Sequence, residues 1–117
     1  MLAQIMHFNG PRSAELVAAG DRASQERLGP IMMAHPRVRE DFVQLLTLRQ
    51  ADGGQLTVLV MRSAEGLELV RELVMSSELL PGEDAALLPG PDRVDVYTVT
   101  ELIGSAESAT NSAAANR

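Results

Sequence analysis

Short apolar stretches and stretches of helical periodicity alternate along the chain. Residues 2–8, 42–50, 55–62 and 93–102 are rich in aliphatic or β-branched residues, and turn-forming residues bound most of them, which is typical of β-strands. Residues 14–35, and the stretch between Ser63 and residue 76, carry apolar residues at three- and four-residue steps, which predicts helices. The predicted element order is therefore β-α-β-β-α-β.

Polar and turn-forming residues mark where these elements begin and end. Ser13 and Ser63 precede the two helices and are suited to cap them. The dipeptide Gly29-Pro30 interrupts the first helix and predicts a kink, or two helical pieces meeting there, and His35-Pro36 predicts its end. Residues 51–54 read Ala-Asp-Gly-Gly, so the second and third strands should form an antiparallel hairpin.

This order predicts an α+β fold of the ferredoxin-like type, with a four-stranded antiparallel sheet and two helices on one face. A chain of 117 residues is expected to form one domain. We assign residues 1–103 to it, because no large apolar side chain follows Ile103. Residues 104–117 are small and polar, and are predicted to be a disordered or weakly ordered C-terminal tail.

The predicted strands are apolar on both faces, although two helices can cover only one. Leu45, Leu46 and Leu48 occupy both parities of the second strand. The uncovered face would be an apolar patch of the kind that marks an interaction site. The simplest cover is a second copy, packed sheet to sheet in a homodimer. The alternative is that residues 76–92 fold over this face within one chain.

Three segments resemble those of a known group of proteins. They are Leu-Gly-Pro-Ile-Met-Met-Ala-His-Pro at 28–36, Val-Leu-Val-Met-Arg-Ser-Ala-Glu-Gly-Leu at 58–67, and Val-Asp-Val-Tyr-Thr-Val at 94–99. They are similar to the dimeric α/β-barrel proteins of the antibiotic-biosynthesis-monooxygenase-like superfamily, over about residues 2–102. Members of that group often carry an aromatic residue, commonly Trp, where this chain has Met61. The haem-degrading members use Asn, Trp and His, whereas this sequence has no Trp, so the resemblance implies a small member without that haem chemistry.

Composition and charge exclude several other classes. The chain has no Cys and two His, so disulfides and thiolate sites are absent, and we expect no metal and no cofactor. A net charge of −6 disfavours nucleic acid and anionic lipid as partners. No apolar run is long enough to span a membrane, and the first residues lack a basic leader region, so we expect a cytoplasmic protein.

Few side chains are suited to directed chemistry. His7 lies mid-strand and shares its face with Ala3 and Ile5, so it could be a base or a hydrogen-bond partner in an apolar cavity. Tyr97 lies on the strand expected beside it, and the two could contact one ligand. Gln4 and Gln44 interrupt apolar strands and are further candidates. The alternative for all four is a structural role with a local partner. His35, at a helix end, is interpreted as structural.

Two hypotheses about function follow, and the sequence does not decide whether the protein is an enzyme. The first is a homodimeric barrel protein that binds a small apolar or aromatic ligand without catalysis. The second is a cofactor-independent monooxygenase or isomerase acting on an aromatic or polyketide-like substrate. The sequence has no nucleophile elbow, P-loop or dinucleotide-binding glycine motif. No catalytic residue is therefore assigned, and the first hypothesis is preferred.

Overall fold

The computed structural model describes residues 1–104, so the predicted tail, apart from Gly104, lies outside the described residues. The strands are β1 (Leu2–Phe8), β2 (Phe42–Arg49), β3 (Gln55–Met61) and β4 (Arg93–Thr98). The helices are α1 (Ala14–Arg22), α2 (Gly29–Ala34), α3 (Pro36–Asp41) and α4 (Ala64–Ser76). A π-helix, η1 (Ala23–Leu28), joins α1 to α2, and a single 3₁₀ turn, η2 (Ala85–Leu87), lies between α4 and β4.

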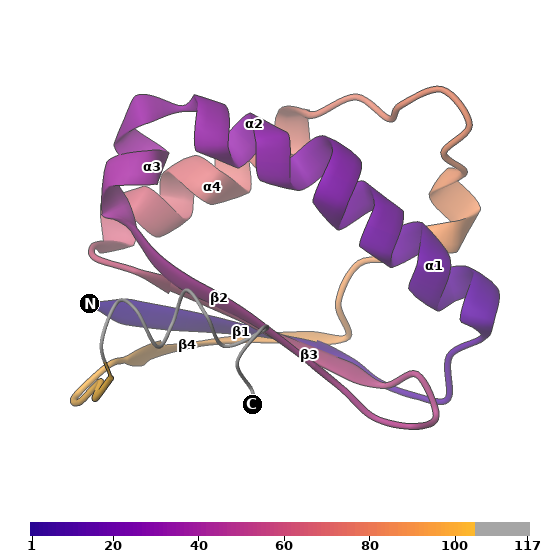
Figure 1. Cartoon of the computed structure of the whole chain (residues 1–117), viewed down its shortest axis with the longest axis horizontal. Coiled ribbons are helices and arrows are strands. Elements are labelled where there is room, and N and C mark those ends of the chain that lie inside the picture. The colour runs from indigo at the N-terminus through magenta and orange to yellow at the C-terminus, as the bar shows by residue number, and fades with distance from the viewer. Residues whose placement is uncertain (105–117) are drawn as a thin grey trace.

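The strands form one antiparallel sheet in the order β2-β3-β1-β4, and the helices lie on one side of it (Figure 1). This is the strand order of a ferredoxin-like fold, so the predicted α+β class is confirmed. The predicted hairpin joins β2 to β3, and its turn needs Gly53, whose φ of 92° is unfavourable for other residues. In the described part of the chain, no helix has the length and apolar character needed to cross a membrane.

Both predicted helix caps are present. The side chain of Ser13 accepts a hydrogen bond from the Leu16 amide at 3.1 Å, and Ser63 accepts one from the Gly66 amide at 3.1 Å. Asp41 in turn accepts hydrogen bonds from the amide and hydroxyl of Ser63, at 3.0 and 2.9 Å. The start of α4 is thereby fixed to the end of α3, because one carboxylate satisfies donors that the helix leaves unpaired.

Two helical pieces meet at Gly29-Pro30, because the π-helix η1 ends at Leu28 and α2 begins at Gly29. The Gly29 amide donates to the carbonyl of Ser24, five residues back, just before Pro30, which has no amide proton to donate. The helix ends at His35 as predicted, but Pro36 then opens the additional helix α3. The prediction missed α3 because proline was interpreted only as a stop, whereas it is equally favoured in the first turn of a helix.

Strand β4 is shorter than predicted, ending at Thr98 rather than at residue 102. Thr98 pairs with Leu2, and the amide of Val99 donates to the carbonyl of Met1 at 2.9 Å. These are the last contacts between β1 and β4, so the residues after Val99 lie outside the ladder that the structure shows.

The core lies between the sheet and the helices, and it occupies only one end of that layer. Its buried members come from β3, α3 and α4: Val38, Leu59, Met61, Leu67 and Val70. Helix α1 contributes no buried residue. At the β4 edge, Val94 and Val96 are 49% and 54% exposed, although the pairing places them on the helix-facing side, with Met6 and Gln4. The helix layer therefore leaves the β4 margin of this side uncovered.

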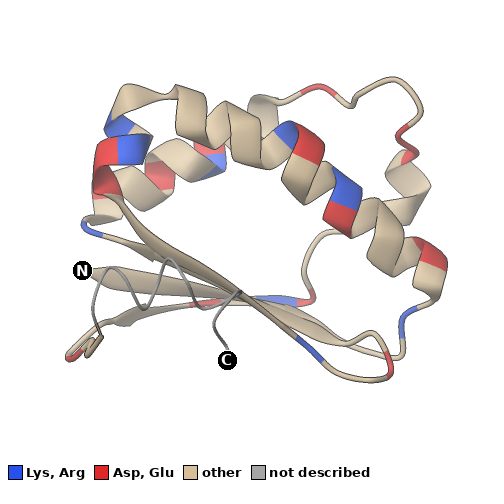
Figure 2. Cartoon of the chain, viewed as in Figure 1, with Lys and Arg blue, Asp and Glu red and all other residues tan. Residues whose placement is uncertain are grey.

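The opposite face, which we call the open face, carries Ala3, Ile5 and His7 of β1 with their cross-strand neighbours. Toward its centre Val60 is buried, but Leu46, Leu48 and Tyr97 at its sides are 41%, 49% and 53% exposed. The strands carry few charges, which gather on the helices and at the strand ends (Figure 2). Residues 76–92 do not cover this face, because η2 packs against α1 in the helix layer.

Candidate functional site

His7 lies on the open face of the sheet, on the central strand β1. Its Nε2 atom is 3.0 Å from Oδ2 of Asp95, on the neighbouring strand β4. The same carboxylate oxygen accepts a hydrogen bond from Nε of Arg93 at 2.8 Å. About three-quarters of each side chain is buried for His7 and Asp95, whereas Arg93 is mostly exposed. The three side chains form one polar cluster at the edge of an apolar surface.

The bond to Asp95 gives the imidazole a defined chemical role. When Nε2 carries the proton and donates it to the carboxylate, Nδ1 of a neutral ring keeps its lone pair. A carboxylate that orients an imidazole in this way is the arrangement used by general bases. The His7–Asp95 pair is therefore capable of accepting a proton from a bound molecule, or of accepting its hydrogen bond.

Tyr97 shares the open face with His7, but the structure does not bring the two side chains together. Tyr97 pairs with Ala3, four residues along β1 from His7. At about 3.4 Å per residue, this separates the two positions by roughly 14 Å along the strand direction. The polar neighbour of His7 is Asp95, which sequence reasoning did not single out. The signal was the shared parity of Arg93, Asp95 and Tyr97, but parity does not fix the register between two strands.

The two glutamine candidates lie on opposite sides of the sheet. Gln4 pairs with Leu59 and Val96, which places it on the helix-facing side. Gln44 pairs with Val60 beside a β-bulge at the start of β2, which places it on the open face. Both are half-buried. The four candidate residues therefore do not form a single site: three share the open face at separate positions, and Gln4 faces the helices.

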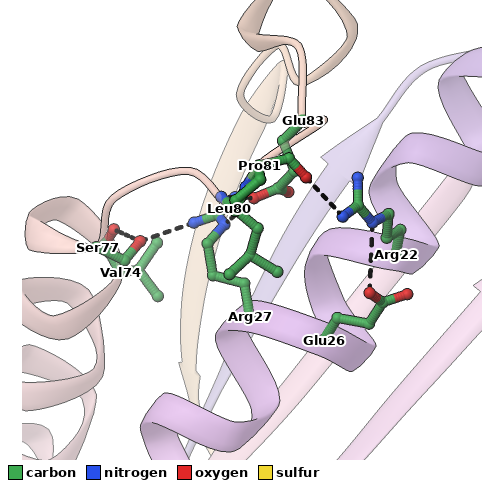
Figure 3. A network of polar contacts seen from close by, with 8 residues as sticks. All are labelled: Arg22, Glu26, Arg27, Val74, Ser77, Leu80, Pro81 and Glu83. Carbon is green, nitrogen blue, oxygen red and sulfur yellow. Dashed lines mark hydrogen bonds and ion pairs between the residues drawn. The ribbon is translucent and has the colours of Figure 1, made fainter.

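A second group of polar side chains attaches the segment after α4 to the π-helix (Figure 3). Arg27 is almost completely buried, and it donates from Nε to Glu83 at 2.7 Å and from Nη1 to the Ser77 hydroxyl at 2.7 Å. The Leu80 amide donates to the same Glu83 oxygen at 2.7 Å. That hydrogen bond, with the charge of Arg27, lowers the pKa of the Glu83 carboxyl below its ordinary value of 4.5, although burial opposes the shift.

A depression of about 730 Å³ lies at the tip of the β2–β3 hairpin, and none of the four candidate residues lines it. Its lining comes from the ends of three strands and the turn: Phe8, Asn9, Gly10, Leu48, Arg49, Gln50, Asp52, Gln55 and Leu56. His35 occupies the N-cap position of α3 without a side-chain capping hydrogen bond, and its Nδ1 atom is buried without a hydrogen-bond partner among the described residues. Within residues 1–104, no three His, Asp or Glu side chains are arranged to hold a metal ion.

Comparison with known proteins supports the fold and goes no further. No family model and no curated protein sequence matches the chain. Among solved structures, it is similar to a dimeric ferredoxin-like protein from an uncultured marine organism, with 17% identity, a TM-score of 0.54, and coverage of 89% of this chain and 90% of that one. It is also similar to SnoaB, a cofactor-independent oxygenase from Streptomyces nogalater, with 14% identity, a TM-score of 0.48, and coverage of 89% of this chain and 94% of that one. The chain thus has the ferredoxin-like fold that its resemblance to the dimeric α/β-barrel proteins predicted.

Proposed function

We propose that this chain forms a homodimeric α/β barrel that binds a small, largely apolar molecule. The observation that carries the proposal is the open face of the sheet, where Leu46, Leu48 and Tyr97 are each more than 40% exposed. A contiguous apolar surface of this kind marks an interaction site. A second copy of the same face is complementary to it across a two-fold axis. The similar structure from the marine organism, which is described as dimeric, supports this choice of partner.

The proposed ligand contacts the His7–Asp95 pair. In a dimer that joins the two open faces, this pair would lie between the sheets, where little water enters. A polar group in such a place is stabilised when it forms a hydrogen bond, so a ligand with a hydroxyl or carbonyl group satisfies it. The neighbouring aliphatic side chains would supply most of the affinity through burial of apolar surface. Tyr97 and Gln44 are further contacts on the same face, whereas Gln4, on the helix-facing side, would not reach a ligand held between the two sheets.

The second candidate function is a cofactor-independent monooxygenase or isomerase that acts on an aromatic or polyketide-like substrate. The observation in its favour is the hydrogen bond between His7 and Asp95, because an oriented imidazole can remove a proton from an acidic C–H or O–H group. Binding without catalysis is preferred, since no second acid or base lies in this cluster besides the carboxylate that holds the ring.

The oligomeric state tests the first proposal. Light scattering after gel filtration should give twice the chain mass of 12.6 kDa at micromolar concentration. Val58→Asp places a charge on the open face and should give a folded monomer, because an unpaired buried charge costs several kcal/mol. Leu59→Asp, in the helix-facing core, should instead unfold the chain. Met75→Asp is the control, since Met75 is 75% exposed on α4 and should leave the dimer intact. A monomeric wild type would refute the proposal.

Ligand binding is tested by a thermal-shift screen of aromatic and polyketide-like compounds. A compound bound at the proposed site should stabilise the wild type and lose that effect in His7→Ala and Asp95→Asn. Tyr97→Phe reports on the second contact. A compound whose effect survives all three substitutions would place the site elsewhere. Incubation of the compound with protein in air, followed by mass spectrometry, separates the candidates: a new product that His7→Ala fails to form supports the enzyme.

A further inference from the structure

Arg12 occupies an unusual position between β1 and α1, on the helix-facing side of the sheet. The carbon of its guanidinium group lies 5.3 Å from the centre of the Phe8 ring. Its Nη1 atom donates to the carbonyl oxygen of Gly53 at 3.2 Å. Its Nη2 atom lies next to Gly20, where a Cβ atom would be 3.5 Å away. The side chain is therefore positioned by an aromatic ring below and a helix above.

The charge of Arg12 is not balanced within the described part of the chain. All ten basic residues of the sequence are arginines, in a chain with 16 acidic residues. Those that form ion pairs are Arg22, Arg27, Arg37, Arg49, Arg71 and Arg93. Of the three described arginines without an ion pair, Arg39 and Arg62 are exposed, whereas Arg12 is half-buried. A half-buried guanidinium with one carbonyl partner still has donors suited to a planar anion.

The helix-facing surface that continues from the Phe8 ring along β1 and β4 is apolar and incompletely covered. Met6 lies two residues before Phe8 on the helix-facing side of β1, and Val94, which pairs with Met6, is 49% exposed. Val94 and Phe8 are diagonal neighbours on adjacent strands, about 7–8 Å apart. A molecule whose anionic group met the guanidinium would thus lay an apolar body along Met6 and Val94.

We propose that Arg12 is a ligand-binding residue that receives the carboxylate group of an amphiphilic ligand, whose apolar part lies on the uncovered β4 margin. The fork of N–H donors on an arginine fits the oxygen pair of a carboxylate better than a lysine does. The face of the Phe8 ring, over which the guanidinium lies, stabilises the positive charge. The inference rests on the proposed ligand-binding function and adds the charge of the ligand. It also separates this position from the His7–Asp95 pair, which lies on the other face of the sheet.

The test compares 1-naphthoate with its neutral analogue 1-naphthamide, using calorimetry and the side-chain Nε–H signals of the ¹⁵N-labelled protein. Naphthoate should bind at least tenfold more tightly than naphthamide, because hydrogen bonds to a charged group are worth more than one power of ten in affinity. It should shift the Nε–H signal that disappears in Arg12→Gln. That variant should lose the preference for the acid, and Arg12→Lys should lose most of it. Arg39→Gln, which removes an exposed arginine without an ion pair, is the matched control and should bind as the wild type does.

Three outcomes would overturn the inference: equal binding of the acid and the amide, a preference that survives Arg12→Gln, or no binding of naphthoate at 10 mM. Equal binding would leave the proposed ligand-binding function standing and remove only the role of Arg12. A circular dichroism spectrum of Arg12→Gln equal to that of the wild type establishes that a lost preference reflects the site. If Arg12→Gln fails to fold, loss of the preference in a folded Arg12→Lys protein supports the inference, and its retention there overturns it.

Discussion

Met61, on β3, offers a direct measurement of where the core lies, because the chain has another methionine, Met75, in the opposite environment. Met61 is completely buried and pairs with Leu2 and Phe42 on either side, whereas Met75, on α4, is 75% exposed. We expect Met61→Ala to lower the free energy of unfolding by about 2–5 kcal/mol, from lost burial and the cavity left behind. Met75→Ala should change it by about 0.5 kcal/mol or less.

Urea denaturation followed by circular dichroism, at one fixed protein concentration, measures both values. For a domain of this size, a loss of 3 kcal/mol corresponds to a fall of roughly 10–20 °C in melting temperature. Met61→Leu, which nearly conserves volume, should cost less than about 1.5 kcal/mol and separates the loss of packing from the loss of the thioether. Equal losses in Met61→Ala and Met75→Ala would refute the placement of the core between β3, α3 and α4.

Three further outcomes are expected. The stability that Glu83 contributes is present above its ordinary carboxyl pKa of 4.5 and is lost as the pH falls through its lowered folded-state pKa. Glu83→Gln should therefore flatten the acidic part of the curve of unfolding free energy against pH. An unchanged curve would contradict the role of the hydrogen bond that Glu83 accepts from the Leu80 amide. Gly66→Ala should lower the free energy of unfolding measured in urea, because the new Cβ atom would collide with the Asp41 carboxylate. An unchanged free energy of unfolding would show that the Asp41 side chain moves aside without cost. Deletion of residues 105–117 should leave the melting temperature nearly unchanged, since no large apolar side chain follows Ile103, and a fall of several degrees would contradict this.

Most of the fold could be predicted from local signals. The capping serines, the Gly-Gly turn and the spacing of apolar residues each act over a few residues, and together they gave the element order and the hairpin. The errors occurred where a local signal has two meanings. Pro36 both ends one helix and begins the next, and the β-branched sequence after Thr98 lies beyond the last residue pair of β1 with β4.

The candidate site was less predictable, because it depends on contacts between residues far apart in the sequence. His7 was singled out from its own strand, but its partner Asp95 is 88 residues away, and only the register of β1 with β4 brings the two together. A shift of two residues in that register would have placed another side chain beside the imidazole. Arg12 was missed because the sequence does not show which arginines find a carboxylate and which do not.

The uneven packing of the helix layer has a consequence for how the molecule opens. Helix α1 has no buried residue, and polar bonds attach it: Asp21 to Arg49 at 2.7 Å, and Arg22 to the Pro81 carbonyl at 3.0 Å. Helix α4, by contrast, contributes Leu67 and Val70 to the core. Amide hydrogen exchange in α1 should therefore proceed by local detachment at a low free energy, whereas exchange in β3 and α4 requires unfolding of the whole domain. Such a hierarchy would let one helix lift from the sheet and admit a small molecule while the rest of the fold stays intact.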